Sequence, residues 1–252
     1  MSVEKILLDS QAAAAAIAAS RLLSCGSARE QRATFSFLLV NAAGCFILSL
    51  FHLRSDQYFW WYVACAALND LAAILALREL FGISVAEYPG IRTAVQRSIY
   101  AWLAVSVLVS AGLSCMTWQS GPKGWTNLYY ILNLHRSLQF SFTAIVISLI
   151  VFLSRYPLEL RRNIYVSGYL FSVVFLTDAA DTMIATLTPK LYDFKVDMAG
   201  VAFLGICFTM WAAMVRKEGI APRRIVFRTS KDAELLRQLE SLNQTLSRIG
   251  RH

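Results

Sequence analysis

The chain has 252 residues, of which 57% are hydrophobic and only 16% are charged, and its mean hydropathy is +0.51. A soluble domain has about 45–50% apolar and about 25% charged residues, so this composition excludes an ordinary soluble globular domain. The formal net charge of +8 is explained by basic loops on one side of a membrane, and we therefore expect no nucleic-acid partner.

Seven apolar stretches follow one another along the chain. A transmembrane helix needs about 20 apolar residues to cross about 30 Å of hydrocarbon. Suitable stretches occupy residues 6–23, 35–51, 58–80, 99–116, 125–153, 164–187 and 196–215. We therefore predict an all-α fold, a bundle of seven transmembrane helices in residues 1–218, followed by a basic cytoplasmic tail with a short amphipathic helix in residues 219–252.

The first apolar stretch is the least hydrophobic of the seven. Asp9, Ser10 and Gln11 lie within it, and a run of alanines occupies positions 12–16. Alanine contributes little to insertion, although its small side chain lets helix backbones approach closely. Two interpretations stay open: a spanning helix that depends on its neighbours, or an amphipathic helix in the membrane interface.

The distribution of basic residues predicts the orientation. Most of the 24 Lys and Arg residues lie in the tail or in the connections after the first, third and fifth helices. The other side has only Lys5, Arg54, Lys123, Lys190 and Lys195. Positive charge stays on the cytoplasmic side, so we expect the N-terminus outside and the C-terminus inside. The predicted location is a bacterial inner (cytoplasmic) membrane.

Several polar side chains fall within the predicted spans, where an ionisable group costs about 2.5–3.5 kcal/mol on insertion scales. Counted from the outer helix ends at 1.5 Å per residue, their depths agree within about 10 Å. The candidate ligand-binding residues are Asp70, Asn133, His135, Arg136, Asp178 and Asp181. We expect Arg136 to lie between the two carboxylates of the sixth helix, with Asp70 or His135 completing the network.

Two interpretations of this cluster stay open. In the first, it is an ion-paired network that holds the helices together and binds nothing. In the second, it lines a pocket that opens outward between the third, fifth and sixth helices, with little that is polar below Asn69. Carboxylates outnumber cations in the cluster, so such a pocket favours a small cationic or polar ligand from the outer side.

Several function classes are disfavoured by missing residues. The chain has no phosphate-binding loop, dinucleotide fingerprint, HExxH or GxSxG motif. A retinal protein needs a lysine near the middle of its last helix, but Lys195 and Lys217 lie at or beyond the ends of the seventh stretch. His52, His135 and His252 are too dispersed for a zinc hydrolase or a haem bundle. We therefore predict no enzyme activity, no cofactor and no metal.

A heptad-spaced apolar seam follows Gly219 and Pro222 in the tail. Its members recur at steps of 4, 3, 4 and 3 residues: Leu235, Leu239, Leu242, Leu246 and Ile249. The seam is short for a coiled coil. It predicts either a helix for self-association or for docking of a cytoplasmic partner, or an amphipathic helix on the inner leaflet.

These features favour a membrane sensor that binds a ligand in its outer half and signals through its tail. A secondary transporter or an ion- or proton-conducting protein is the alternative, because buried carboxylates also serve as proton and cation relays. An accessory subunit of a larger membrane complex is a third hypothesis.

Overall fold

The computed structural model describes residues 3–52, 55–86, 88–117, 126–155, 162–187, 194–216, 237–238, 240–241 and 243–245. For some helical positions, including Asn133, Arg136 and Asp197, only the backbone is described. These ranges include most of each predicted apolar stretch, and only a small part of the tail.

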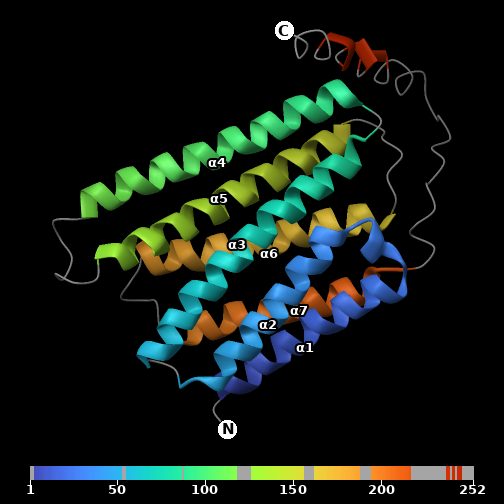
Figure 1. Ribbon diagram of the computed structural model, residues 1–252. Helices are drawn as coiled ribbons and strands as arrows, with labels where there is room; N and C mark the ends of the chain where they lie inside the picture. The colour runs from blue at the N-terminus through green and yellow to red at the C-terminus, as the bar shows by residue number, and fades with distance from the viewer. Residues whose placement is uncertain are drawn as a thin grey trace.

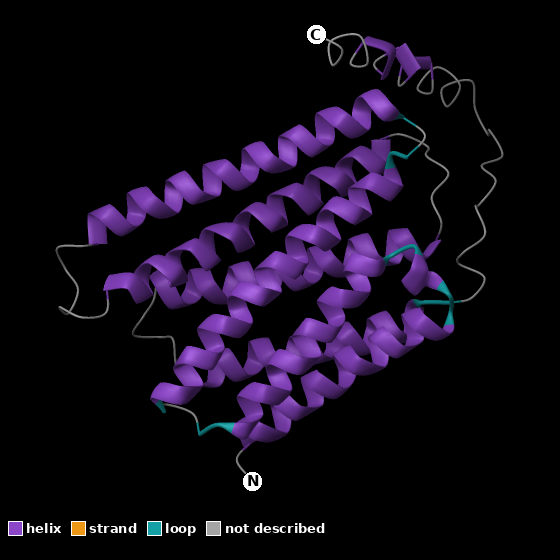
Figure 2. Cartoon of the chain, in the orientation of Figure 1, coloured by secondary structure: helices purple, strands orange, loops and turns teal. Residues whose placement is uncertain are grey.

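The described residues form long helices that run side by side as one bundle (Figure 1). In chain order they are α1 (Val3–Ser24), the short 3-10 helix η1 (Ser27–Arg29), α2 (Arg32–Leu50), α3 (Asp56–Ser84), α4 (Pro89–Thr117), α5 (Thr126–Arg155), α6 (Arg162–Leu187) and α7 (Phe194–Met214). The described part of the chain has no β-strand, as Figure 2 shows. The all-α fold is therefore confirmed.

Each predicted apolar stretch corresponds to one of these helices. The largest difference is at α4, which begins at Pro89, ten residues before the predicted start at residue 99. Proline suits the first turn of a helix because its missing N–H would have no partner there. The polar segment that follows, with Arg92 and Arg97, extends the helix beyond its apolar part, so hydropathy alone places the start too late.

Four helical segments of the described chain are long and apolar enough to cross a membrane: α1, α2, α3 and Arg162–Asp181 of α6. Shorter apolar segments are Ser137–Ser148 and Met198–Met214. Large apolar side chains also lie on the outside of the bundle, such as Phe46 at 56% and Leu68 at 57% exposure. Many large apolar side chains exposed over one bundle mark a surface that contacts lipid, and together with the four apolar segments they indicate a membrane-embedded helical protein.

Helix α1 packs mainly against α2 and α7. Ala15 and Ala18 are fully buried, and the Cα of Gln11 lies 3.7 Å from where a Cβ of Gly205 would be. Small residues on both helices let their backbones approach closely, which is how helices associate in lipid. The alanine-rich stretch therefore lies within the bundle and not apart from it.

Aromatic rings fill the centre of the bundle. Phe171 lies 5.1 Å from Phe37, 5.4 Å from Phe175 and 5.0 Å from Trp211 between ring centroids, and all four side chains are fully buried. Edge-to-face and offset geometries of this kind add about 0.5–1.5 kcal/mol per pair to the burial of the rings. The cluster joins α2, α6 and α7.

Polar contacts hold the helix ends together on the side where α2 begins. Asn163 of α6 donates from Nδ2 to Ser27 Oγ and to the Arg216 carbonyl, both at 2.9 Å. Glu79 Oε2 of α3 accepts from the backbone N–H groups of Ala33 and Thr34 at 2.9 and 3.1 Å. A carboxylate at the positive end of α2 caps that helix from a neighbouring one.

The described part of the tail lies beside the start of α4 (Figure 1). Asn243 Oδ1 accepts from the Ile91 backbone N–H at 3.4 Å. The five apolar residues of the predicted heptad seam lie outside the described residues, so the seam stays a prediction.

Candidate ligand-binding site

The Asp70 carboxylate is bound from two positions on α5. Its Oδ2 lies 2.8 Å from His135 Nδ1, and its Oδ1 accepts from Gln139 Nε2 at 3.2 Å. His135 and Gln139 are four residues apart, so they lie on the same face of α5 and can meet one side chain of α3. Asp70 is 6% exposed and Gln139 is fully buried. This group joins α3 to α5 in the middle of the bundle.

Two amide oxygens close to this group are buried without a hydrogen-bond partner among the described residues: Asn69 Oδ1 and Gln139 Oε1. A buried polar atom left unpaired costs about 1–3 kcal/mol, and such atoms in native structures usually meet water or a ligand. Asn69 lines the cavity described next, so its oxygen has a place to find such a partner.

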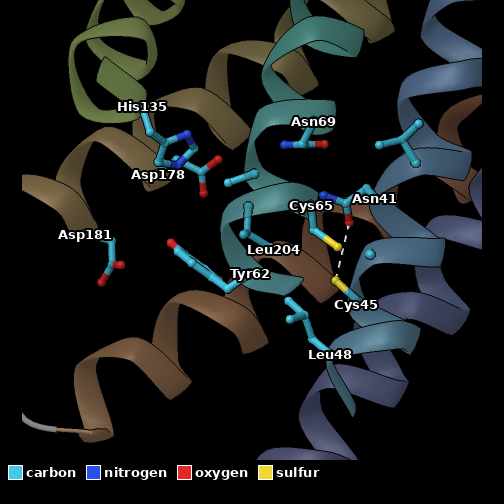
Figure 3. Close-up of a pocket in the computed structure, with 13 residues that line it drawn as sticks. Asn41, Cys45, Leu48, Tyr62, Cys65, Asn69, His135, Asp178, Asp181 and Leu204 are labelled. Atoms are coloured by element: carbon cyan, nitrogen blue, oxygen red, sulfur yellow. Dashed lines mark hydrogen bonds between the residues drawn. The ribbon is translucent and has the colours of Figure 1, made fainter. Parts of the chain in front are cut away.

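A cavity of ≈ 170 Å³ lies next to His135. Its polar lining comes from four helices (Figure 3): Asn41 and Cys45 of α2, Tyr62, Cys65 and Asn69 of α3, His135 of α5, and Asp178 and Asp181 of α6. Val40, Gly44, Leu48, Ala66 and Leu204 complete the wall. One buried water needs only about 10–15 Å³, so the cavity has room for several waters or a small organic molecule.

The cavity lies in one half of the bundle. Its wall runs from Asn69, midway along α3, to Tyr62 near the start of that helix and Leu48 near the end of α2. At 1.5 Å per residue, Tyr62 and Asn69 are about 10 Å apart along the helix axis. The exposed rings of Trp60 and Trp61 lie beyond Tyr62 at the same end. Rings of this kind favour the headgroup level of a membrane.

Asn41 connects the cavity to α1. Its Oδ1 accepts from Gln11 Nε2 at 3.4 Å and lies 3.7 Å from Cys45 Sγ. Gln11 is only 4% exposed, although it belongs to the most polar part of α1. Of the three polar residues in this stretch, Gln11 is therefore directed into the bundle, whereas Ser10 is exposed.

The lining is acidic. Asp178 and Asp181 contribute carboxylates, His135 contributes an imidazole whose Nδ1 is committed to Asp70, and no Lys or Arg belongs to the described wall. Amide, phenol and thiol groups supply the remaining polar atoms. This set can surround a cation and can accept hydrogen bonds from ammonium or hydroxyl groups.

The structure brings together part of the predicted cluster. His135, Asp178 and Asp181 line one cavity, and Asp70 lies behind His135 as its hydrogen-bond partner. The side chains of Asn133 and Arg136 lie outside the described residues, so the pairing of Arg136 with a carboxylate of α6 stays a prediction.

Helix α2 contributes to the cavity wall, which the sequence pattern did not predict. We expected an opening between the third, fifth and sixth helices, whereas α2 supplies Asn41, Gly44 and Cys45. An added Cβ at Gly44 would lie 3.4 Å from Cys65 Cβ, so the glycine lets α2 come close to α3 at this level. Asn41 and Gln11 are polar residues in apolar stretches, and that signal could have identified them.

No protein-family model, curated protein or solved structure matches the chain. Within the described residues, no group of three or more His, Cys, Asp or Glu side chains is arranged to hold a metal ion.

Proposed function

We propose that all seven helices cross the membrane, with the N-terminus outside and the C-terminus in the cytoplasm of a bacterial-type cell. The asymmetry of Lys and Arg supports this orientation. Helix α4 has no charged residue after Arg97, and α7 has none after Asp197. In this arrangement the acidic cavity lies in the outer half of the bundle.

Cysteine labelling tests this topology. With the native cysteines replaced, Ser120→Cys should react with an impermeant reagent added to intact cells, and Ser230→Cys should react only after the cells are permeabilised. Labelling of Ser230→Cys in intact cells would reverse the proposed orientation.

We further propose that the protein is a membrane sensor that binds a small cationic or hydroxyl-rich molecule from outside. One observation carries the proposal: Asp178 and Asp181 line a cavity beside His135, and that cavity has no Lys or Arg in its described wall. Charged residues inside a bundle are expensive to insert and are most often functional. The tail is the proposed route by which the bound state reaches a partner or a second copy of the chain.

Thermal stability with added compounds tests ligand binding. The purified protein is screened in detergent or nanodiscs against alkali cations, small primary and quaternary amines, and polyols. A compound that binds the folded state should raise the melting temperature as its concentration increases, since binding stabilises by about 2.7 kcal/mol at 100 times its dissociation constant.

Matched variants make the screen specific. Asp178→Asn and Asp181→Asn should abolish the shift, while Asp56→Asn, an exposed acid at the predicted outer end of α3, should leave it unchanged. If no compound stabilises the wild type, the ligand proposal fails and the accessory-subunit hypothesis becomes the stronger one.

A transporter or proton-conducting protein is the second candidate, and one observation favours it. His135, Gln139 and Thr143 follow each other at four-residue steps on α5, and the last two are buried. Polar atoms therefore continue from Asp70 toward the other end of the helix. Flux of a stabilising compound or of protons into proteoliposomes, lost in Gln139→Leu, would favour this function over a sensor.

A further inference from the structure

A second cavity, of ≈ 580 Å³, lies at the other end of α3 from the acidic one. It is formed where α2 begins, α3 ends and α4 begins. Three arginines line it, one from each helix: Arg32, Arg78 and Arg92. Most Lys and Arg residues of the described helices lie toward this end of the bundle, which is the proposed cytoplasmic side.

The arginines leave this cavity positively charged. Glu79 is the acidic residue of its wall, and Glu79 Oε2 already accepts two backbone N–H groups at the start of α2. The Arg92 Nη2 atom lies 3.9 Å from where a Cβ of Gly82 would be, so the guanidinium of α4 reaches across the end of α3. All three arginine side chains are exposed, and no ion pair joins them to an acid among the described residues.

Apolar stripes continue from the arginines along the outside of the bundle. On α3, Arg78 follows Leu68, Leu71 and Leu75 at helical spacing, and these leucines are 57%, 55% and 46% exposed. Leu75 itself belongs to the cavity wall.

Helix α2 also carries an arginine in line with exposed apolar residues, but here the apolar residues come after the arginine in the sequence. Arg32 and Ser36 of the cavity wall are followed on the same face by Leu39 and Phe46, which are 44% and 56% exposed. Because α2 and α3 pack against each other, the two stripes run beside one another away from the same basic cavity.

We propose that this cavity binds the headgroup of an anionic phospholipid, with the phosphate between the arginines and the acyl chains along the two stripes. Guanidinium groups bind phosphate oxygens with two parallel N–H donors, and they are weakly hydrated, which suits a site at a membrane surface. Basic pockets between helices on the cytoplasmic side are typical binding places for anionic headgroups. The apolar stripes distinguish a lipid from free phosphate.

Native mass spectrometry of the full chain measures bound lipid directly. The protein is equilibrated with micelles containing phosphatidylglycerol, phosphatidylcholine or inorganic phosphate, and the bound adducts are counted. We expect retained phosphatidylglycerol, little phosphatidylcholine, and no saturable binding of inorganic phosphate. Equal retention of the two lipids would overturn the proposal, and so would phosphate binding as tight as that of the lipid.

Variants locate the lipid. Each arginine near a phosphate is worth roughly a fivefold change in affinity, so Arg78→Gln combined with Arg92→Gln should weaken phosphatidylglycerol binding about 25-fold. Arg97→Gln removes an exposed arginine of α4 that does not line the cavity, and it should have no effect.

Two further variants distinguish the effect of the arginine charge on lipid binding from an effect on folding and from the effect of the apolar stripes. Arg78→Lys with Arg92→Lys keeps the charge, so it should retain more lipid than the glutamine pair. Leu71→Gln should weaken the long-chain lipid and leave a short-chain, soluble phosphatidylglycerol unaffected. If the glutamine pair binds lipid as the wild type does, the arginines are not the site. If that pair fails to fold, the comparison of the two lipids on the wild type still decides the proposal.

Discussion

A double-mutant cycle on Asp70 and His135 tests whether the buried pair acts as a unit. The single variants are Asp70→Leu and His135→Leu, and the third protein carries both changes. The distance of 2.8 Å between Nδ1 and Oδ2 is typical of a charge-assisted hydrogen bond. With Asp70 only 6% exposed, little water can replace the imidazole.

The expected losses of stability depend on which buried polar groups lose a hydrogen-bond partner in each variant. His135→Leu leaves the Asp70 carboxylate with one contact, the 3.2 Å bond from Gln139, and breaking a buried pair from one side costs about 3–5 kcal/mol. The double variant removes the carboxylate as well, so of the two hydrogen bonds to Asp70 it leaves the neutral Gln139 amide short of a partner, at about 1–3 kcal/mol. We therefore expect the double variant to be about 2 kcal/mol more stable than His135→Leu alone.

Unfolding in mixed detergent micelles containing sodium dodecyl sulfate, followed by tryptophan fluorescence, measures these differences. His52→Leu, at an exposed histidine, is the matched control and should change stability by less than about 0.5 kcal/mol. If the two single effects add in the double variant, the two side chains do not interact and the proposed pair is wrong.

Three further predictions test the packing with the same unfolding assay. Phe171→Ala should lower the free energy of unfolding by about 3–5 kcal/mol because it empties the centre of the aromatic cluster. The control Phe203→Ala, at a side chain 46% exposed, should lower it by less than about 1 kcal/mol. Equal losses of stability would contradict the assigned core. Glu79→Gln should cost about 1 kcal/mol by weakening the cap on α2, and an unchanged stability would show that the cap is not needed. Gly205→Ala should be tolerated, since its Cβ would lie 3.7 Å from Gln11 Cα. Gly205→Leu should lower the free energy of unfolding by about 1–3 kcal/mol. Equal stability of the two variants would contradict the close approach of α1 and α7.

The helices could be predicted from the sequence because membrane insertion makes hydropathy a strong signal. The polar extensions of the helices were harder to predict, as the start of α4 at Pro89 shows. A helix can continue past its apolar part because its backbone hydrogen bonds do not depend on apolar side chains. Four described segments meet the length and hydropathy of a membrane span, so the seven-span topology stays a proposal.

The depth of the polar residues could be predicted, but their partners could not. Counting along each helix placed Asp70, His135, Asp178 and Asp181 at similar levels, and three of them line one cavity while Asp70 contacts His135. The rotation of each helix about its axis is set by packing against its neighbours, and a single sequence carries little information on it. For that reason the role of Asn41 in joining the cavity to α1 emerged only from the structure.

We propose that the cavity is acidic and open to the outside, and Cys65 in its wall reports on both properties. Cys65 is partly exposed, and it lies beside Asn69 and Tyr62 on the cavity side of α3. A variant is needed that keeps Cys65 and lacks the other four cysteines: Cys25, Cys45, Cys115 and Cys207. Its modification by cationic and anionic methanethiosulfonates is compared in right-side-out vesicles.

After correction for each reagent's rate with a free thiol, the cationic reagent added outside should modify Cys65 about fivefold faster than the anionic one, as expected for a difference of roughly 1 kcal/mol between the electrostatic energies of the two reagents at the site. Asp178→Asn with Asp181→Asn should remove that preference. Failure of either reagent to react from outside, or equal corrected rates in the parent protein, would contradict an outward-open acidic site.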